Sequence, residues 1–473
     1  MKKVQNLFFL VPLLLFTWIA AKSTRLAGGE DGVMHHLFAR YVPEHPANLL
    51  DHWAKPLYVL LSMPFAQFGI FGSLLFNVLL ATLTAWLLWR TAQNLNLHNP
   101  WLAPILLFSS TIYFYCVPSS ITEILFSFLF TWALFETTRR NYWAAALLVS
   151  FLPFARSEGN GIVLLFVIAF LALRQWKAIP LLAVGTVLYS IAGSFYYDDL
   201  FWVWNQHPYG DASGIYGHGS LLHFLGRNKE IWGNPLYILW ILGTLLFAIN
   251  TFKLIARRKA VKADYWIWLF LIFGSYFLYL GGHTVVWYLG KSGSLGLTRV
   301  MAAIMPACAL MATYAMDGVV QVFNPKLKII TKGLAFVLAF LAIGSTWKLN
   351  HPPFYGDLEK EELLQAGEWF RESEYFADRA RVFYFAPSVA ESFRIDPFNP
   401  AERGDLSEIQ WNRDIPSGSI IVWDAHFGPN ECHIPIDTLL QRSELELIYH
   451  QKPKGKISTL NGYDYEIYLF RKP

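Results

Sequence analysis

The chain has 473 residues, of which 55% are hydrophobic, 17% aromatic and 15% charged. Soluble globular proteins carry roughly 25% charged residues, so this composition excludes an ordinary soluble protein and indicates one embedded in lipid. The net charge of +4 is small and its positive residues are spread between apolar runs, which argues against a nucleic-acid partner. The three cysteines predict neither a disulfide framework nor a thiolate metal site.

Long apolar runs recur along most of the chain. At 1.5 Å of rise per residue, runs of about 15 to 20 residues can cross the hydrocarbon core of a bilayer. The first run follows Lys2 and Lys3 like a signal peptide, but we interpret it as a retained span because many apolar runs follow it. The chain is therefore predicted to be an all-α polytopic membrane protein with about 11 transmembrane helices. The predicted spans are 5–21, 69–89, 101–117, 121–138, 142–155, 160–173, 178–195, 235–252, 266–284, 299–316 and 330–347.

Basic residues between these runs predict which face of the membrane each loop occupies, because Lys and Arg are retained on the cytoplasmic side. Alternate loops carry Arg90, Arg139, Arg140, Arg174, Lys177, Arg257, Arg258, Lys259, Lys262, Lys326 and Lys328. This side, together with the N-terminus, is predicted to be cytoplasmic. The longer loops 22–68, 196–234 and 285–298 then lie on the opposite face, and an odd number of spans places 348–473 there too.

The C-terminal segment 348–473 differs in pattern from the rest of the chain. An amphipathic helix is predicted over 357–376 and a shorter one over Pro435–Arg442. Short strands are predicted at Arg381–Ala386, Ile420–Asp424, Leu445–Tyr449 and Tyr465–Phe470. We therefore expect a small extracytoplasmic α/β domain over 348–473, following a membrane domain over 1–347. Since it shows no glycine-rich phosphate loop and no nucleophile motif, a structural or acceptor-binding role is favoured over catalysis.

The first outer segment begins with a pair of carboxylates, Glu30 and Asp31, directly after the first span. Two histidines, His35 and His36, follow in a short amphipathic stretch that we expect to lie along the membrane surface. The alternative interpretation is a solvated turn whose acids simply favour the start of a helix.

A lysine immediately precedes a proline later in the same segment, in the string Asp51-His52-Trp53-Ala54-Lys55-Pro56. A lysine near a membrane boundary is ordinarily an interfacial anchor. The neighbouring Asp51 and His52 favour a functional interpretation instead.

Further charges lie at the outer ends of predicted spans. Glu123 starts one span, and Arg156 and Glu158 lie in a turn between two others. Such charges are costly at membrane depth unless they are paired or line a watery cavity, so structural pairing of Arg156 with Glu158 or Glu123 is the alternative. The glycine-rich loop before Arg299 combines a flexible backbone with a guanidinium, which suits a phosphate.

These motifs resemble those of GT-C fold membrane glycosyltransferases, which use polyprenyl-phosphate sugars as donors. Members of that class carry an acidic pair after the first span, as Glu30-Asp31 does here. Lys55-Pro56-Leu57 is similar to the lysine-proline motif of the aminoarabinose and protein-mannosyl transferase branch, although a single proline replaces the doubled proline of the aminoarabinose enzymes. The donor of that branch is therefore not carried over. Arg156-Ser157-Glu158-Gly159 and Gly296-Leu297-Thr298-Arg299 resemble turns of bacterial members.

The resemblance implies an inverting transfer of a monosaccharide to an acceptor hydroxyl, at the periplasmic face of a bacterial inner membrane. Asp31, with Glu30 as second choice, would be the general base. Lys55, Arg156 and Arg299 would surround the donor phosphate, supported by Asp51, His52, Glu123 and Glu158. No cofactor is identified with certainty, and a divalent metal held by His35, His36 or the 207–223 loop is left open. The acceptor is a lipid, a glycan or a protein.

Three other functions remain open from the sequence. A flippase or transporter of a lipid-linked sugar would use the same charges to line a pathway, although they cluster at outer span ends rather than mid-span. A polysaccharide polymerase or ligase would also use outer arginines, but does not require the acidic pair. The third is a non-catalytic scaffold. The enzymatic interpretation predicts that Asp31, Lys55, Arg156 and Arg299 meet in one cavity, with an acidic wall facing a cationic wall.

Overall fold

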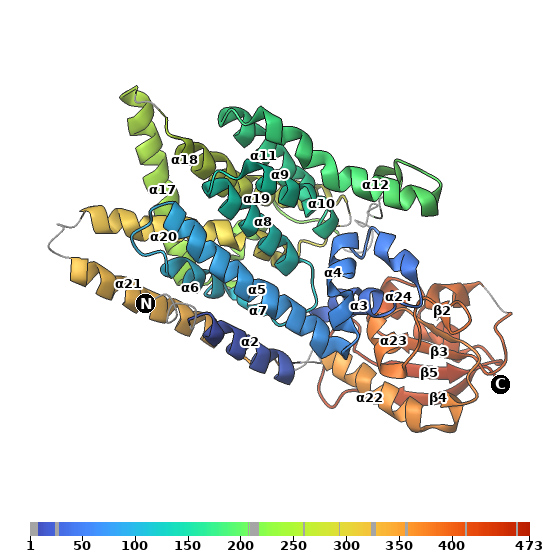
Figure 1. The fold of residues 1–473 in the computed structure, drawn as a ribbon. Helices are drawn as coiled ribbons and strands as arrows, with labels where there is room; N and C mark the ends of the chain where they lie inside the picture. The colour runs from blue at the N-terminus through green and yellow to red at the C-terminus, as the bar shows by residue number, and fades with distance from the viewer. Residues whose placement is uncertain are drawn as a thin grey trace.

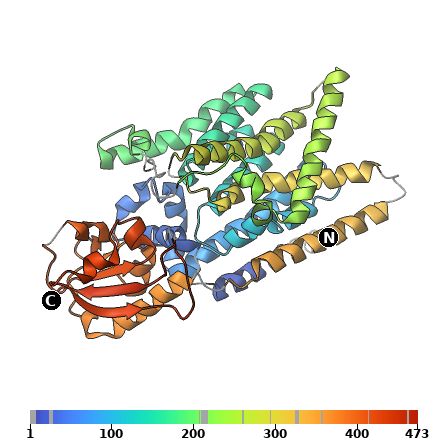
Figure 2. The same ribbon diagram turned by 180° about the vertical axis from the view of Figure 1, so that it is seen from behind.

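The structure is a computed structural model that describes residues 8–23, 28–206, 208, 217–258, 261–292, 294–322, 328–354, 358–411, 414–459 and 462–473. Lys2, Lys3, Lys259, Lys326 and His207 lie outside these ranges. A bundle of helices forms most of the molecule, and a smaller unit built on a β-sheet lies at one end of it (Figures 1 and 2).

The bundle is formed by helices of very different lengths. The elements up to α12 are α2 (Leu10–Lys22), α3 (Gly29–Arg40), η1 (Pro46–Leu50), α4 (Pro56–Ala66), α5 (Gly69–Asn94), α6 (Leu102–Phe108), α7 (Thr111–Cys116), α8 (Glu123–Thr138), α9 (Tyr142–Ser150), α10 (Leu152–Ala155), α11 (Gly159–Ala172), η2 (Trp176–Ala183) and α12 (Val184–Tyr197). They are followed by α13 (Trp202–Asn205), α15 (His223–Gly226), α16 (Asn228–Ile231), α17 (Asn234–Ala256), α18 (Ala263–Trp266), η3 (Ile267–Gly274), α19 (Ser275–Leu289), η4 (Thr298–Ile304), α20 (Met305–Val322) and α21 (Lys328–Asn350).

Within the described ranges, 6 helical segments are long and apolar enough to cross a membrane, so the chain is an integral membrane protein. They are Gly69–Asn94, Trp176–Tyr197, Asn234–Ala256, Ala263–Leu289, Thr298–Gly318 and Gly333–Asn350. The other predicted runs form shorter helices, so the predicted count of about 11 spans is not confirmed. The run 101–117, for example, is divided into α6 and α7, because the Ser110 side chain accepts the Tyr113 N–H and starts a new helix.

The segment Thr298–Gly318 lies at the centre of the bundle. Of its apolar stretch, 94% is buried within the protein, compared with 17% for Asn234–Ala256 at the periphery. Small side chains such as Ala303, Ala307 and Ala312 are fully buried there and allow close approach of neighbouring helices. Arg299, at the start of this segment, is consequently carried into the interior of the molecule.

The C-terminal unit contains a sheet of five strands in the order β2-β1-β3-β5-β4, counted over the described residues. The strands are β1 (Val382–Tyr384), β2 (Arg403–Asp405), β3 (Ile420–Asp424), β4 (Glu446–Gln451) and β5 (Ile467–Arg471). β1 pairs in parallel with β2 and β3, whereas β5 is antiparallel to β3 and β4. Every residue of the central strand β3 is buried.

The helices of the C-terminal unit are α22 (Leu358–Glu372), η6 (Glu374–Phe376), α23 (Pro387–Phe393), η7 (Leu406–Gln410), α24 (Phe427–Asn430) and α25 (Ile436–Leu440). The helices predicted over 357–376 and 435–442 are therefore present, and so are the four predicted strands. Strand β2 was not predicted, since its three residues, Arg-Gly-Asp, carry no β-pattern. Because α21 continues to Asn350, the proposed domain boundary at 347 falls inside a helix.

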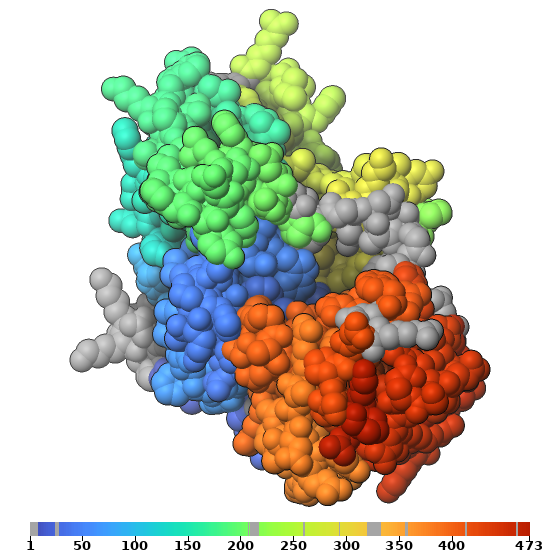
Figure 3. Space-filling view, turned by 90° about the vertical axis from the view of Figure 1, so that its right-hand side faces the viewer, coloured from blue at the N-terminus to red at the C-terminus, as the bar shows by residue number. Residues whose placement is uncertain are grey.

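Helix α3 connects the bundle to the C-terminal unit, which lies against this first outer segment (Figure 3). It is packed between α4 and α23, and its residues Val33 and Leu37 are buried. Protein therefore covers the apolar face of this predicted amphipathic stretch on both sides. Glu30, in its first turn, accepts hydrogen bonds from the Ser388 backbone N–H (2.7 Å) and the Ser388 hydroxyl.

Candidate functional site

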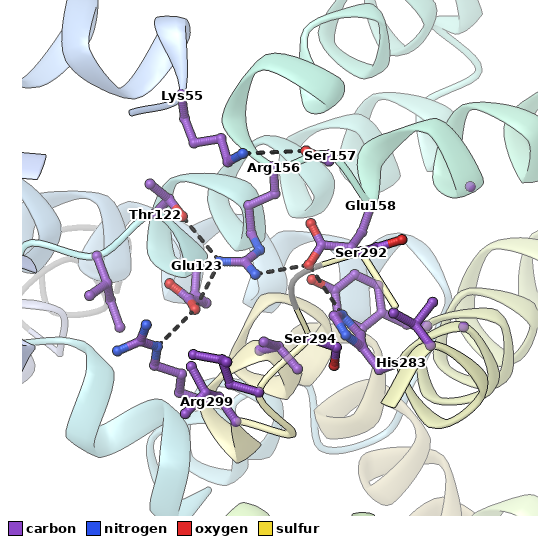
Figure 4. A pocket seen from close by; sticks show the side chains of 18 of the residues that line it. Lys55, Thr122, Glu123, Arg156, Ser157, Glu158, His283, Ser292, Ser294 and Arg299 are labelled. Carbon is purple, nitrogen blue, oxygen red and sulfur yellow. Dashed lines mark hydrogen bonds and ion pairs between the residues drawn. The ribbon is translucent and has the colours of Figure 1, made fainter. Parts of the chain in front are cut away.

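A cavity of about 510 Å³ lies where several loops meet the ends of the helices (Figure 4). Its polar lining comes from segments far apart in the sequence: Asp31, His35, Lys55, Thr122, Glu123, Arg156, Ser157, Glu158, His283, Ser292, Ser294 and Arg299. The predicted meeting of Asp31, Lys55, Arg156 and Arg299 therefore occurs in the structure. Glu123 and Glu158 line the same cavity.

Glu123 lies at the centre of the charge network. Its Oε1 atom is 2.8 Å from Arg156 Nη1 and 3.6 Å from Arg299 Nε, and its side chain is only 2% exposed. The carboxylate belongs to the first turn of α8, where the helix dipole also favours a negative charge. One buried carboxylate thus holds two arginines that are 143 positions apart in the chain, counting from 156 to 299.

Arg156 is bound by a second carboxylate as well. Its Nη2 atom lies 2.8 Å from Glu158 Oε1, and Nη1 donates to Thr122 Oγ1 at 3.1 Å. His283 Nε2, from α19, lies 3.2 Å from the same Glu158 oxygen. Although burial opposes ionisation, Arg156 and His283 hold the pKa of the Glu158 carboxyl well below its usual range.

Lys55 has an unusual backbone conformation immediately before helix α4. Its φ of 67° lies in the left-handed region, which non-glycine residues rarely adopt, and Pro56 follows it. The side chain is directed into the cavity, where Nζ donates to Ser157 Oγ (3.3 Å) and to the His52 carbonyl (3.2 Å) (Figure 4). Burial lowers the pKa of Lys55 to about 8, with Glu158 opposing the shift.

Asp31 and Glu30 are adjacent in sequence but face different partners. Asp31 forms an ion pair with Arg299 and its side chain remains 42% exposed. Burial raises the pKa of the Asp31 carboxyl, but Arg299 outweighs this effect and holds it below its usual value, so the carboxylate is ionised at neutral pH. Glu30 is instead occupied by Ser388 of the C-terminal unit.

The two histidines that follow do not converge on one point. His35 lines the cavity and stacks on Trp53, with ring centroids 4.9 Å apart. His36 is fully buried on the other side of α3, where Nδ1 lies 2.9 Å from Ser73 Oγ. Over the described part of the chain, no group of three or more His, Cys, Asp or Glu residues is placed to hold a metal ion. Most of the 207–223 loop lies outside that part.

The predicted supporting residues Asp51 and His52 do not line the cavity but shape the turn that presents Lys55. Asp51 Oδ1 accepts the Ala54 backbone N–H at 2.8 Å, and the His52 carbonyl accepts from Lys55 Nζ. The expectation of an acidic wall facing a cationic wall is wrong, because acids and cations alternate in bonded pairs. Unpaired charges of one sign at this depth would be strongly unfavourable.

Several cavity residues were missed by sequence reasoning. His283 and Tyr279 lie inside the apolar run of α19, and Ser157 lies within a motif singled out only for its charges. The signal that could have identified His283 is a titratable side chain after two glycines in an otherwise apolar span.

Glu123→Gln should destabilise the protein by about 3 kcal/mol, because two buried guanidinium groups lose their shared negative charge while each keeps one other partner. Thermal unfolding of the purified full chain in detergent measures this. The matched control is Glu230→Gln, which breaks the exposed Arg227–Glu230 pair (3.1 Å) and should cost about 1 kcal/mol or less. Equally small effects of both substitutions would contradict a stabilising role for the network.

The chain was compared with protein families, curated proteins and solved structures. No protein-family model matches the sequence, and no curated protein matches it. Among solved structures, ArnT from Cupriavidus metallidurans bound to undecaprenyl phosphate is similar, with a TM-score of 0.63 and 11% identity, over 99% of this chain and 98% of that one.

A second similar structure is the Archaeoglobus fulgidus oligosaccharyltransferase tethered to an acceptor peptide, with a TM-score of 0.50 and 12% identity. The match covers 82% of this chain and 63% of the oligosaccharyltransferase chain. At such low identities the likeness concerns the fold. The chain therefore has the GT-C fold of membrane glycosyltransferases, as the motif resemblance predicted.

Proposed function

We propose that this protein is an inverting glycosyltransferase, which moves a monosaccharide from a polyprenyl-phosphate donor to an acceptor hydroxyl at the extracytoplasmic face of the membrane. The observation that carries the proposal is the shared cavity, which is lined by a partly exposed carboxylate, Asp31, and by the cations Lys55 and Arg299. The GT-C fold and the likeness over the whole chain to a structure with bound undecaprenyl phosphate support a lipid-linked donor.

The lining of the cavity suits both ends of such a donor. Ile162, Leu278 and Val286 provide an apolar side, and Leu278 is 37% exposed at the outside of the bundle, where a prenyl chain would approach. Lys55 and Arg299 provide positive charge for the phosphate. Arg156, held between Glu123 and Glu158, is better suited to positioning these groups than to binding phosphate itself.

Asp31 is the preferred base because it is ionised and accessible from the cavity, whereas both oxygens of Glu30 are engaged by Ser388. A donor phosphate beside Arg299 would share the guanidinium with Asp31 and so increase the basicity of the carboxylate. Asp31 would then take the hydroxyl proton while the acceptor oxygen attacks the anomeric carbon. The bond from that carbon to the phosphate oxygen breaks, its electron pair leaves with the phosphate, and a single displacement inverts the configuration.

We propose a bacterial inner-membrane location with a cytoplasmic N-terminus and a periplasmic C-terminal unit. The basic loops support this orientation, since Arg90, Arg139 and Arg174 lie between predicted spans on one side. The cavity lies among the loops of the opposite side. Both substrates would then meet outside the cytoplasm.

Asp31→Asn should reduce sugar transfer from a radiolabelled polyprenyl-phosphate sugar by about 10²- to 10⁴-fold, the usual contribution of a general base. The matched control Asp198→Asn changes an exposed aspartate at the end of α12, in a left-handed conformation that asparagine tolerates. It should leave transfer unchanged. Full activity of a folded Asp31→Asn variant would remove Asp31 as the base.

The affinity for undecaprenyl phosphate should fall as pH rises above about 8, because Lys55 with its pKa of about 8 loses its proton and its positive charge. Below that pH the lysine is charged and its contribution is complete. Titration of binding between about pH 7 and pH 9.5 measures the effect, which we expect to reach about tenfold. Lys55→Arg should remove the decline, since a guanidinium stays protonated throughout this range. An identical decline in both proteins would exclude Lys55 as its source.

Alkaline phosphatase fused after Pro473 should be active in a bacterial host, because this enzyme folds only outside the cytoplasm, where its disulfides form. A green fluorescent protein fused at the same position should be dark if exported unfolded. The reverse result, fluorescence without phosphatase activity, would place the C-terminal unit in the cytoplasm.

A further inference from the structure

A second cavity, of about 840 Å³, lies between the first outer segment and the C-terminal unit. It adjoins the first cavity, since Asp31, Trp53, Leu295, Leu297 and Arg299 line both. Asp31 is therefore reached from two sides: from the membrane helices through one cavity and from the C-terminal unit through the other. Figure 3 shows the C-terminal unit directly beside the first outer segment that carries Asp31.

We propose that this second cavity binds the acceptor, and that the acceptor presents a neutral or amine-bearing, hydroxyl-rich sugar to Asp31. The inference rests on the proposed glycosyl transfer and adds to it the chemical class of the acceptor and a task for the C-terminal unit.

The first feature that indicates a ligand in this cavity is the hydroxyl group of Tyr384. Tyr384 ends strand β1, is 2% exposed and lines the second cavity, yet its Oη atom has no hydrogen-bond partner among the described residues. A buried hydroxyl without a partner costs free energy, so a polar ligand group that bonds to it would recover that cost. Its ring is fixed by Arg403, whose guanidinium carbon lies 5.6 Å from the ring centroid.

Asp424 provides a second polar group on the same side. It ends the central strand β3 and is 1% exposed, and its Oδ1 atom accepts the backbone N–H groups of His426 (3.0 Å) and Phe427 (2.9 Å). These bonds hold the carboxylate in one orientation at the cavity wall. Burial raises the pKa of Asp424.

Aromatic rings complete the lining, with Trp53 on the bundle side and Phe385 and Phe427 on the C-terminal side. The latter two lie against each other with centroids 5.2 Å apart. A sugar ring combines an apolar face of C–H groups with a rim of hydroxyls. Flat aromatic surfaces beside a buried carboxylate and a phenol match both parts of such a ligand.

The charges of the cavity discriminate against an anionic acceptor. Glu30, Asp31, Glu359, Asp424 and Glu431 line it. Arg299, Lys360 and Arg403 line it as well, but Arg299 is paired with Asp31 and Arg403 Nη2 lies 3.6 Å from Asp405 Oδ2, so the lining carboxylates outnumber the lining cations. A phosphorylated or carboxylated acceptor would meet these carboxylates at close range, whereas hydroxyls and amines would find acceptors for their hydrogens.

The test uses the full chain in detergent on an array of neutral, amino-bearing and phosphorylated oligosaccharides, with an array of peptides in parallel. The variants are Tyr384→Phe and Asp424→Asn, which preserve side-chain shape. Their matched controls are Tyr463→Phe and Asp437→Asn, at exposed positions of the same unit that do not line the cavity. Binding of undecaprenyl phosphate is measured for every protein.

We expect the wild type to retain neutral or amino-bearing oligosaccharides. Tyr384→Phe should weaken this binding about three- to tenfold and Asp424→Asn about tenfold or more, while the controls bind like the wild type. Undecaprenyl phosphate should bind equally to all five proteins. Retention of only peptides or phosphorylated glycans, retention of nothing, or unchanged binding in both variants would overturn the inference while leaving the donor site intact. Loss of undecaprenyl phosphate binding in the wild type would instead overturn the proposed function.

Discussion

The sharing of Glu123 by Arg156 and Arg299 is the interaction on which the rest of the site depends. A carboxylate that is 2% exposed can exist there only because two guanidinium groups offset the cost of its burial. In return it fixes the turn that carries Ser157 and Glu158 and the start of the central segment Thr298–Gly318. The charged groups at this side of the cavity are therefore held in place before any substrate binds. Preorganised charges of this kind stabilise a transition state best.

Around these paired charges the chain brings together an apolar and a polar environment. The membrane helices contribute apolar surface next to Lys55, and the C-terminal unit contributes aromatic rings and hydrogen-bonding groups around Asp424. Asp31 lies where the two meet. The proposed transfer from a lipid-linked donor to a hydroxyl-rich sugar would require such a junction, because an apolar prenyl chain and a polar sugar need different surroundings.

Much of this arrangement could be predicted from the sequence, and the failures have physical causes. Strand β3 and the charged ends of the apolar helices were identifiable because continuous apolar runs and charges beside them are strong local signals. The convergence of Lys55 with Arg156 was predicted by resemblance, not by any local pattern. Burial of α3, strand β2 and the inclusion of His283 depend on contacts between distant segments, which periodicity does not record. The alternation of acids and cations likewise follows only from tertiary pairing.

The hydrogen bonds from Ser388 to Glu30 tie the C-terminal unit to α3, the helix that also carries Asp31. Glu30 and Asp31 are successive residues of α3, so their side chains point about 100° apart. Because one helix carries both, a movement of Glu30, which Ser388 holds, also moves Asp31. A shift of α23, which carries Ser388, would therefore change the direction in which the Asp31 carboxylate points within the cavity. The C-terminal unit would thus set the orientation of α3, and its removal would leave the Asp31 carboxylate chemically intact but no longer fixed in direction.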